Sequence, residues 1–88
     1  MRQIYRKGEF IIIGNFIVIN TKKEFKQGHT HLNNYYAAKR AIYLVRNHKI
    51  PSRCSKYFLV SLIRISNDRD YIRMVELALE KAIDGIAD

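Results

Sequence analysis

The pair of alternate histidines in the segment Gly28-His29-Thr30-His31 is the feature of this sequence best suited to chemistry. On an extended segment, side chains two positions apart point the same way, so His29 and His31 could share one metal ion. A metal site needs a third ligand, and no other histidine, cysteine or acidic residue stands at a spacing typical of metal binding. We therefore predict no metal site. We expect these two histidines to hydrogen-bond the loop, cap the following helix or contact a phosphate near its N-terminus.

The other residues with catalytic potential lack the neighbours that catalysis requires. Cys54 falls on the expected buried stripe of a helix, where a thiol behaves as a small hydrophobic group. The sequence contains no glycine-rich phosphate loop, nucleophile elbow or spaced pair of carboxylates. A single histidine is able to transfer protons, but no motif in the sequence supports that role for His29, His31 or His48. We expect a protein that is not an enzyme and carries no cofactor.

Positive charge is the strongest compositional feature. Sixteen Lys and Arg residues stand against eight Asp and Glu residues, a net charge of +8. Residues 1–57 hold twelve of the basic residues and only two of the acidic ones, whereas residues 58–88 are net negative. A phosphate-rich or acidic partner for the first two-thirds of the chain is the expected reason. The alternative is a lysine-rich surface that serves solubility alone.

The composition also predicts the cellular location of the protein and its number of domains. One cysteine rules out an intramolecular disulfide, and the N-terminus lacks the apolar segment and cleavage site of a secretory signal. The longest apolar run, residues 10–19, is too short to span a bilayer. We expect a cytoplasmic protein with no membrane contact, folded as one domain over residues 1–88. Its size and charge are typical of accessory proteins of phages and mobile elements.

Residues 9–20 have the clearest β pattern. Gly14-Asn15 is a two-residue turn signal between β-branched and aromatic runs, which predicts an antiparallel hairpin. One face of that hairpin would hold Phe10, Ile12, Ile17 and Ile19. The other face is also apolar, so we expect it to form a homodimer or partner interface through Ile11, Ile13, Phe16 and Val18. A further turn at Lys7-Gly8 would add residues 2–6 as a third strand.

Residues 21–32 have no clear periodicity and predict a polar loop, and three helices follow it. The first begins at Asn33-Asn34 and runs to about His48, ahead of Pro51. The second begins at Ser52 and runs to about Ile65. The third begins at Ser66 or Asn67, has Asp68 and Asp70 in its first turn, and stops at Gly85. The expected fold class is α+β, with an N-terminal antiparallel β-hairpin or three-stranded meander packed against three C-terminal α-helices.

Tyrosines alternate with lysine and arginine on the expected exposed side of the first helix. Cations neutralise phosphates, and tyrosine rings stack on unpaired bases. The second helix and the polar loop add further cations. The predicted nucleic-acid-binding residues are Lys22, Lys23, Lys26, Tyr35, Tyr36, Lys39, Tyr43, Arg46, Arg53, Lys56 and Arg64. In the alternative arrangement, the tyrosines cover the second face of the hairpin.

We therefore expect a small, noncatalytic nucleic-acid-binding accessory protein whose partner is DNA or RNA. A short connection between the first two helices also permits a helix-turn-helix, with Ser52, Arg53, Ser55 and Lys56 at the start of the reading helix. The alternative function is a protein-interaction module, an inhibitor or assembly factor. Its basic face would then meet an acidic protein or a ribonucleoprotein, with the hairpin as the dimer or partner interface.

Overall fold

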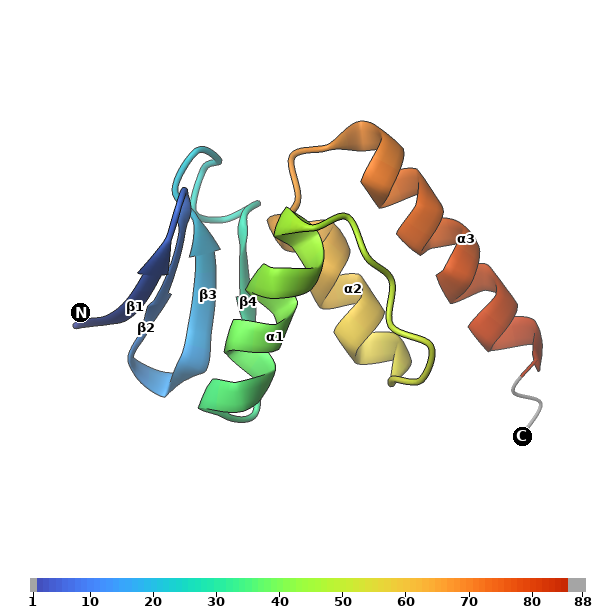
Figure 1. Ribbon diagram of the computed structural model, residues 1–88, viewed down its shortest axis with the longest axis horizontal. Helices are drawn as coiled ribbons and strands as arrows, with labels where there is room; N and C mark the ends of the chain where they lie inside the picture. Colours follow the sequence, from blue (N-terminus) through green and yellow to red (C-terminus); the bar gives the residue numbers. More distant parts are fainter. Residues whose placement is uncertain (1, 86–88) are drawn as a thin grey trace.

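The computed structural model describes residues 2–85 and has an α+β arrangement, a four-stranded antiparallel sheet followed by three helices (Figure 1). The strands, in sheet order, are β1 (Gln3–Lys7), β2 (Phe10–Ile13), β3 (Ile17–Asn20) and β4 (His29–His31). The helices are α1 (Tyr35–Arg46), α2 (Lys56–Ile65) and α3 (Arg69–Gly85). The predicted fold class and the third strand are confirmed. The fourth strand was not predicted, because residues 21–32 lack periodicity.

The turn between β2 and β3 is one residue longer than predicted. Gly14–Phe16 forms it as a short 3-10 element, and both Asn15 and Phe16 have positive φ. Ile13 consequently pairs with Ile17, and Ile12 pairs with Val18. Side chains alternate along a strand, so a shift of one residue moves every side chain of β3 to the opposite face. Asparagine often adopts positive φ, but phenylalanine rarely does, so the sequence did not indicate this turn.

The predicted interface through Ile11, Ile13, Phe16 and Val18 is therefore wrong as a single surface. Val18 is fully buried and faces the helices, and Phe16 packs against the core. Ile11 and Ile13 lie on the outer face of the sheet, beside Ile17 and Ile19 of β3. On that face Ile13 and Ile17 are buried and the other two isoleucines are half-buried. Side chains of this chain already cover much of the outer face.

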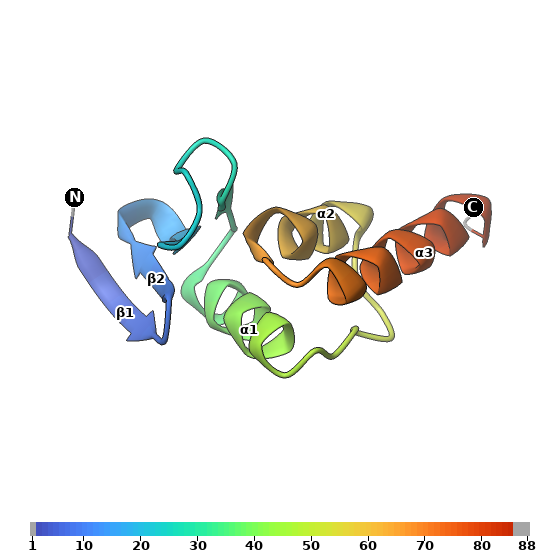
Figure 2. The same cartoon turned by 90° about the horizontal axis from the view of Figure 1, so that it is seen from above.

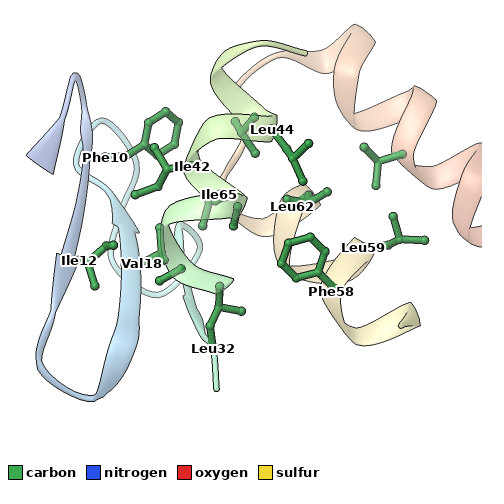
Figure 3. Packing of buried hydrophobic residues seen from close by; sticks show 14 of the residues in the cluster. Phe10, Ile12, Val18, Leu32, Ile42, Leu44, Phe58, Leu59, Leu62 and Ile65 are labelled. Atoms are coloured by element: carbon green, nitrogen blue, oxygen red, sulfur yellow. The ribbon is translucent and has the colours of Figure 1, made fainter. Parts of the chain in front are cut away.

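The core lies between the inner face of the sheet and the helices (Figure 3). Phe10, Ile12 and Val18 from the hairpin meet Ile42 of α1. The helix α2 contributes its buried stripe, and Tyr71 and Val75 of α3 complete the cluster from the far side. The α2 residues in this core are Phe58, Leu59, Leu62 and Ile65.

Buried polar contacts hold β4 and the end of β3 against α2. The Thr30 hydroxyl donates to the Ser61 hydroxyl at 2.8 Å, and both residues are buried. The Asn20 side-chain amide donates to the carbonyl of Ile65 at 2.9 Å, at the end of α2. A buried polar group without a partner costs about 1–3 kcal/mol, so these pairs specify how β3 and β4 dock on α2. They join residues more than thirty positions apart in the sequence.

Each helix is capped, although not always by the predicted residue. Asn34 caps α1 as predicted, accepting from Ala37 N–H at 2.8 Å. The helix ends at Arg46, and His48 follows in the left-handed region with φ 54. Ser55 caps α2 in place of Ser52, and Asp68 caps α3 in place of Ser66 or Asn67.

The connection between α1 and α2 excludes the predicted helix-turn-helix. It spans residues 47–55, and the predicted reading residues Ser52, Arg53 and Ser55 lie in it before α2 begins. Cys54 also precedes α2, where it is half-buried against the core and not on a helical stripe. Burial raises the pKa of its thiol, against a smaller opposite effect of Arg40. A thiol held protonated in this way is a poor nucleophile.

The molecule is elongated, with principal extents of 40 × 25 × 22 Å. The helices α1 and α2 lie between the sheet and α3, so α3 occupies one end of the molecule (Figures 1 and 2). Within the described residues, no helix combines the length and apolar character needed to cross a membrane.

Candidate nucleic-acid interface

A shallow groove of about 510 Å³ runs along the exposed side of α1, next to β1. We call it the tyrosine groove; its lining residues are Tyr5, Tyr35, Tyr36, Lys39, Arg40 and Tyr43. All but Tyr5 come from α1, where spacings of three and four residues bring side chains to one surface. Tyr5 reaches the groove from β1, because it pairs with Ile12 and shares the inner face of the sheet.

One end of the groove is built around Lys39. Its ammonium lies 5.1 Å from the ring centroid of Tyr5 and 5.3 Å from that of Tyr35. The two rings meet edge to face, with centroids 6.3 Å apart. A cation over an aromatic face is attracted by the ring quadrupole, by about 0.5–1 kcal/mol at exposed sites. These contacts hold the charge of Lys39 beside two aromatic rings.

The outer ridge of the groove carries two tyrosines that are largely free of packing. Tyr36 is 74% exposed and Tyr43 is 54% exposed. They stand seven residues apart, which places them about 10 Å apart along the helix axis. Arg40 lies between them in the sequence, and the Lys49 ammonium lies 6.0 Å from the Tyr43 ring. The alternative in which the tyrosines cover the hairpin does not hold for Tyr36 and Tyr43, because more than half of each side chain is exposed.

Cations at the margins of the groove have partners within the protein. The guanidinium of Arg40 lies over the Phe58 ring, 5.2 Å from its centroid. Arg46 lies beyond the groove, where its guanidinium stands 3.9 Å from the Glu9 carboxylate. It also stands against Gly8, whose φ of +61 suits the tight turn between β1 and β2. Arg46 is thus half-exposed, with part of its charge balanced.

Two of the predicted binding cations hold the fold together. The Lys23 ammonium donates to the carbonyls of Arg64 and Ser66, both at 3.1 Å, at the C-terminal end of α2. Arg64 donates from Nε to the His29 carbonyl at 2.8 Å and from its terminal nitrogen to the Lys26 carbonyl at 3.3 Å. Burial, and to a lesser degree Arg64, lowers the pKa of Lys23. These side chains serve as structural contacts between the loop and α2.

The remaining predicted cations lie away from the tyrosine groove. Lys22 and Lys26 are exposed on the loop before β4, at the opposite edge of the sheet from β1. Arg53 and Lys56 are exposed at the start of α2, and Lys56 is about 12 Å along the helix axis from Arg64. The predicted residues therefore form separate groups. Only Tyr35, Tyr36, Lys39 and Tyr43 come together as predicted.

His29 and His31 point outward from β4 and form an aromatic ladder with Phe25. The Phe25 and His29 rings stack in parallel with centroids 4.2 Å apart, and His29 meets His31 edge to face at 5.4 Å. The His29 ring nitrogen Nδ1 donates to the Phe25 carbonyl. Within residues 2–85, no group of three potential metal ligands comes together. Of the roles predicted for the two histidines, His29 has that of hydrogen-bonding the loop.

Two groove residues were missed at the sequence level, although both carried a signal. Arg40 stands four residues after Tyr36 and three before Tyr43, so helical spacing alone places it on their ridge. Tyr5 alternates with Arg6 on the predicted third strand, which puts only one of them on the helix side. The pairing of β1 with β2 decides which one, and that pairing contains a bulge between Gln3 and Tyr5.

No protein-family model, curated protein or solved structure matches this chain. The chemistry of the groove therefore rests on its own residues. Aromatic faces set among cations suit a ligand that carries both flat rings and negative charge.

Proposed function

We propose that the protein is a noncatalytic nucleic-acid-binding protein whose tyrosine groove holds a single strand of DNA or RNA. The observation that carries the proposal is the pairing of exposed tyrosines with cations in that groove. Tyr36 and Tyr43 are each more than half exposed, the Lys49 ammonium lies over the Tyr43 ring, and Lys39 and Arg40 lie between the two tyrosines along α1. Bases stack on tyrosine rings, and phosphates are neutralised by the cations.

A single strand fits this chemistry better than a duplex. Ring faces are useful only to unstacked bases, and base edges in a duplex are read mainly by arginine, asparagine and glutamine. Tyr36 and Tyr43 are about 10 Å apart along α1, a distance that leaves room for backbone and phosphate between two stacked bases. The long connection between α1 and α2 does not form the predicted helix-turn-helix. Residues 66–68 join α2 to α3 by a shorter connection, but α3 carries a net negative charge that a duplex would repel.

The alternative partner is an acidic protein or a ribonucleoprotein. It has less support, because the hairpin side chains that were to form its interface are largely packed within the fold.

Paired substitutions in the groove test the proposal. Stacking on an aromatic residue is worth about 1–3 kcal/mol per base, so replacing both Tyr36 and Tyr43 by Leu should weaken single-strand binding at least tenfold. Replacing both by Phe keeps the rings and should preserve most of the affinity. The measurement is fluorescence anisotropy with labelled single-stranded DNA and RNA.

A matched charge reversal provides the control. Lys39→Glu should weaken binding several-fold more than Lys22→Glu, which makes the same charge change at the opposite edge of the sheet. Equal losses in the two folded variants would mean that net charge, and not the groove, determines binding. That result would contradict the proposal.

A further inference from the structure

The exposed side of α3 carries an apolar pair between opposite charges. Met74 is 46% exposed and Leu77 is 51% exposed. Asp70 and Lys81 flank them, and both are exposed. The spacings of four, three and four residues place these side chains in one stripe along the helix. We call it the α3 stripe, with residues Asp70, Met74, Leu77 and Lys81.

The described chain covers this stripe only in part: Ile50, from the connection between α1 and α2, lies beside Met74, Leu77 and Lys81 and leaves about half of Met74 and Leu77 exposed. The helix packs mainly against α2, through Tyr71 and Val75 on its other side. It lies at the end of the molecule away from the sheet (Figure 2). Among the described residues, no ion pair involves the charged members of the stripe or the neighbouring Arg73 and Glu80.

The stripe is complementary to itself in one orientation only. If a second α3 runs antiparallel about a two-fold axis between Met74 and Leu77, each methionine meets the leucine of the other copy. Asp70 then faces Lys81 of the other copy, and the flanking Arg73 faces Glu80. A parallel arrangement would instead place like charges opposite each other, which is destabilising. The order of charges along the helix therefore selects the antiparallel pair.

We infer that α3 is a self-association surface and that its partner is a second copy of this chain. The apolar pair supplies the attraction. Each exposed ion pair adds little binding free energy, but together the ion pairs determine the orientation of the two helices. A contact between two single helices is small, so the dimer is weak and forms in the upper micromolar range. This inference is independent of the proposed nucleic-acid binding.

A charge exchange along α3 tests the inference by sedimentation equilibrium at about 150 mM salt, where repulsion between the two net-positive chains is screened. The wild-type protein should associate as the concentration rises. Arg73→Glu and Glu80→Arg each place like charges opposite one another and should weaken the dimer several-fold. The double variant R73E/E80R restores opposite charges and should recover most of the wild-type association. Leu77→Lys should abolish it.

Circular dichroism shows which variants remain folded, and only those are compared. A wild-type protein that stays monomeric up to about 1 mM would overturn the inference, since that concentration corresponds to a binding free energy of only about −4 kcal/mol. A double variant that associates no better than either single variant would also overturn it, because the antiparallel charge pairing would then be absent.

Discussion

Tyr71 shows how a single hydroxyl ties α3 to the rest of the protein. Its side chain is almost fully buried in the core, and its hydroxyl donates to the carbonyl of Lys49 at 2.7 Å. The sequence places Tyr71 on the packed side of the third helix, but the partner of its hydroxyl lies 22 positions away. Burial of the ring raises the pKa of Tyr71 to about 12.

The raised pKa predicts a loss of stability at high pH. The unfolded chain releases this proton near pH 10 and the folded chain near pH 12, so the contribution of Tyr71 is complete below pH 10. The stability contributed by Tyr71 declines between pH 10 and 12, and at pH 11 it is about 1.4 kcal/mol lower than at neutral pH. Tyr71→Phe should cost about 1 kcal/mol at pH 8 through the lost hydrogen bond. At pH 11, urea unfolding should find the variant at least as stable as the wild type. If the wild type were more stable than the variant by the same amount at pH 8 and at pH 11, this account would be contradicted.

The elements of this protein follow from local sequence, but their register does not. Residues 9–20 do form a hairpin, and three helices follow in the predicted order, although α2 begins at Lys56 and not at Ser52. The face of β2 that holds Phe10 and Ile12 was predicted correctly, but the faces of β3 were exchanged, because the turn contains Phe16 as well as Gly14 and Asn15. One additional turn residue moves every side chain of β3 to the opposite face of the sheet. The strand β4 was not predicted, because contacts with α2 stabilise it and such long-range contacts leave no periodic pattern in the local sequence.

The attachment of the loop to α2 can be tested at Lys23. Its ammonium satisfies two carbonyls at the end of the helix, where a positive charge also complements the helix dipole. Lys23→Met removes these contacts and should lower the free energy of unfolding by about 1 kcal/mol, measured by urea denaturation. Lys22→Met removes the same charge from an exposed side chain and should change stability by less than about 0.5 kcal/mol. Equal effects of the two substitutions would show that Lys23 is not a structural contact.

At the scale of the whole molecule, the uneven charge of the sequence corresponds to a division in space. The sheet, its loop and α1 carry most of the positive charge, and α3 at the far end carries alternating charges. Composition predicts a basic surface and helical spacing predicts part of its membership. Neither composition nor helical spacing predicts which cations are available to a ligand. Lys23 and Arg64 resemble Lys39 in the sequence, and they differ from it only in their tertiary hydrogen bonds.

The salt dependence of single-strand binding tests the central claim most directly. Three or four phosphate contacts in and around the tyrosine groove should reduce affinity about 20–50-fold between 50 and 200 mM salt. We would measure anisotropy with a labelled single strand and with the corresponding duplex across this range. The account predicts tighter binding to the single strand at both salt concentrations and a steep loss as salt increases. Binding that favours the duplex, or no binding at 50 mM salt, would contradict it.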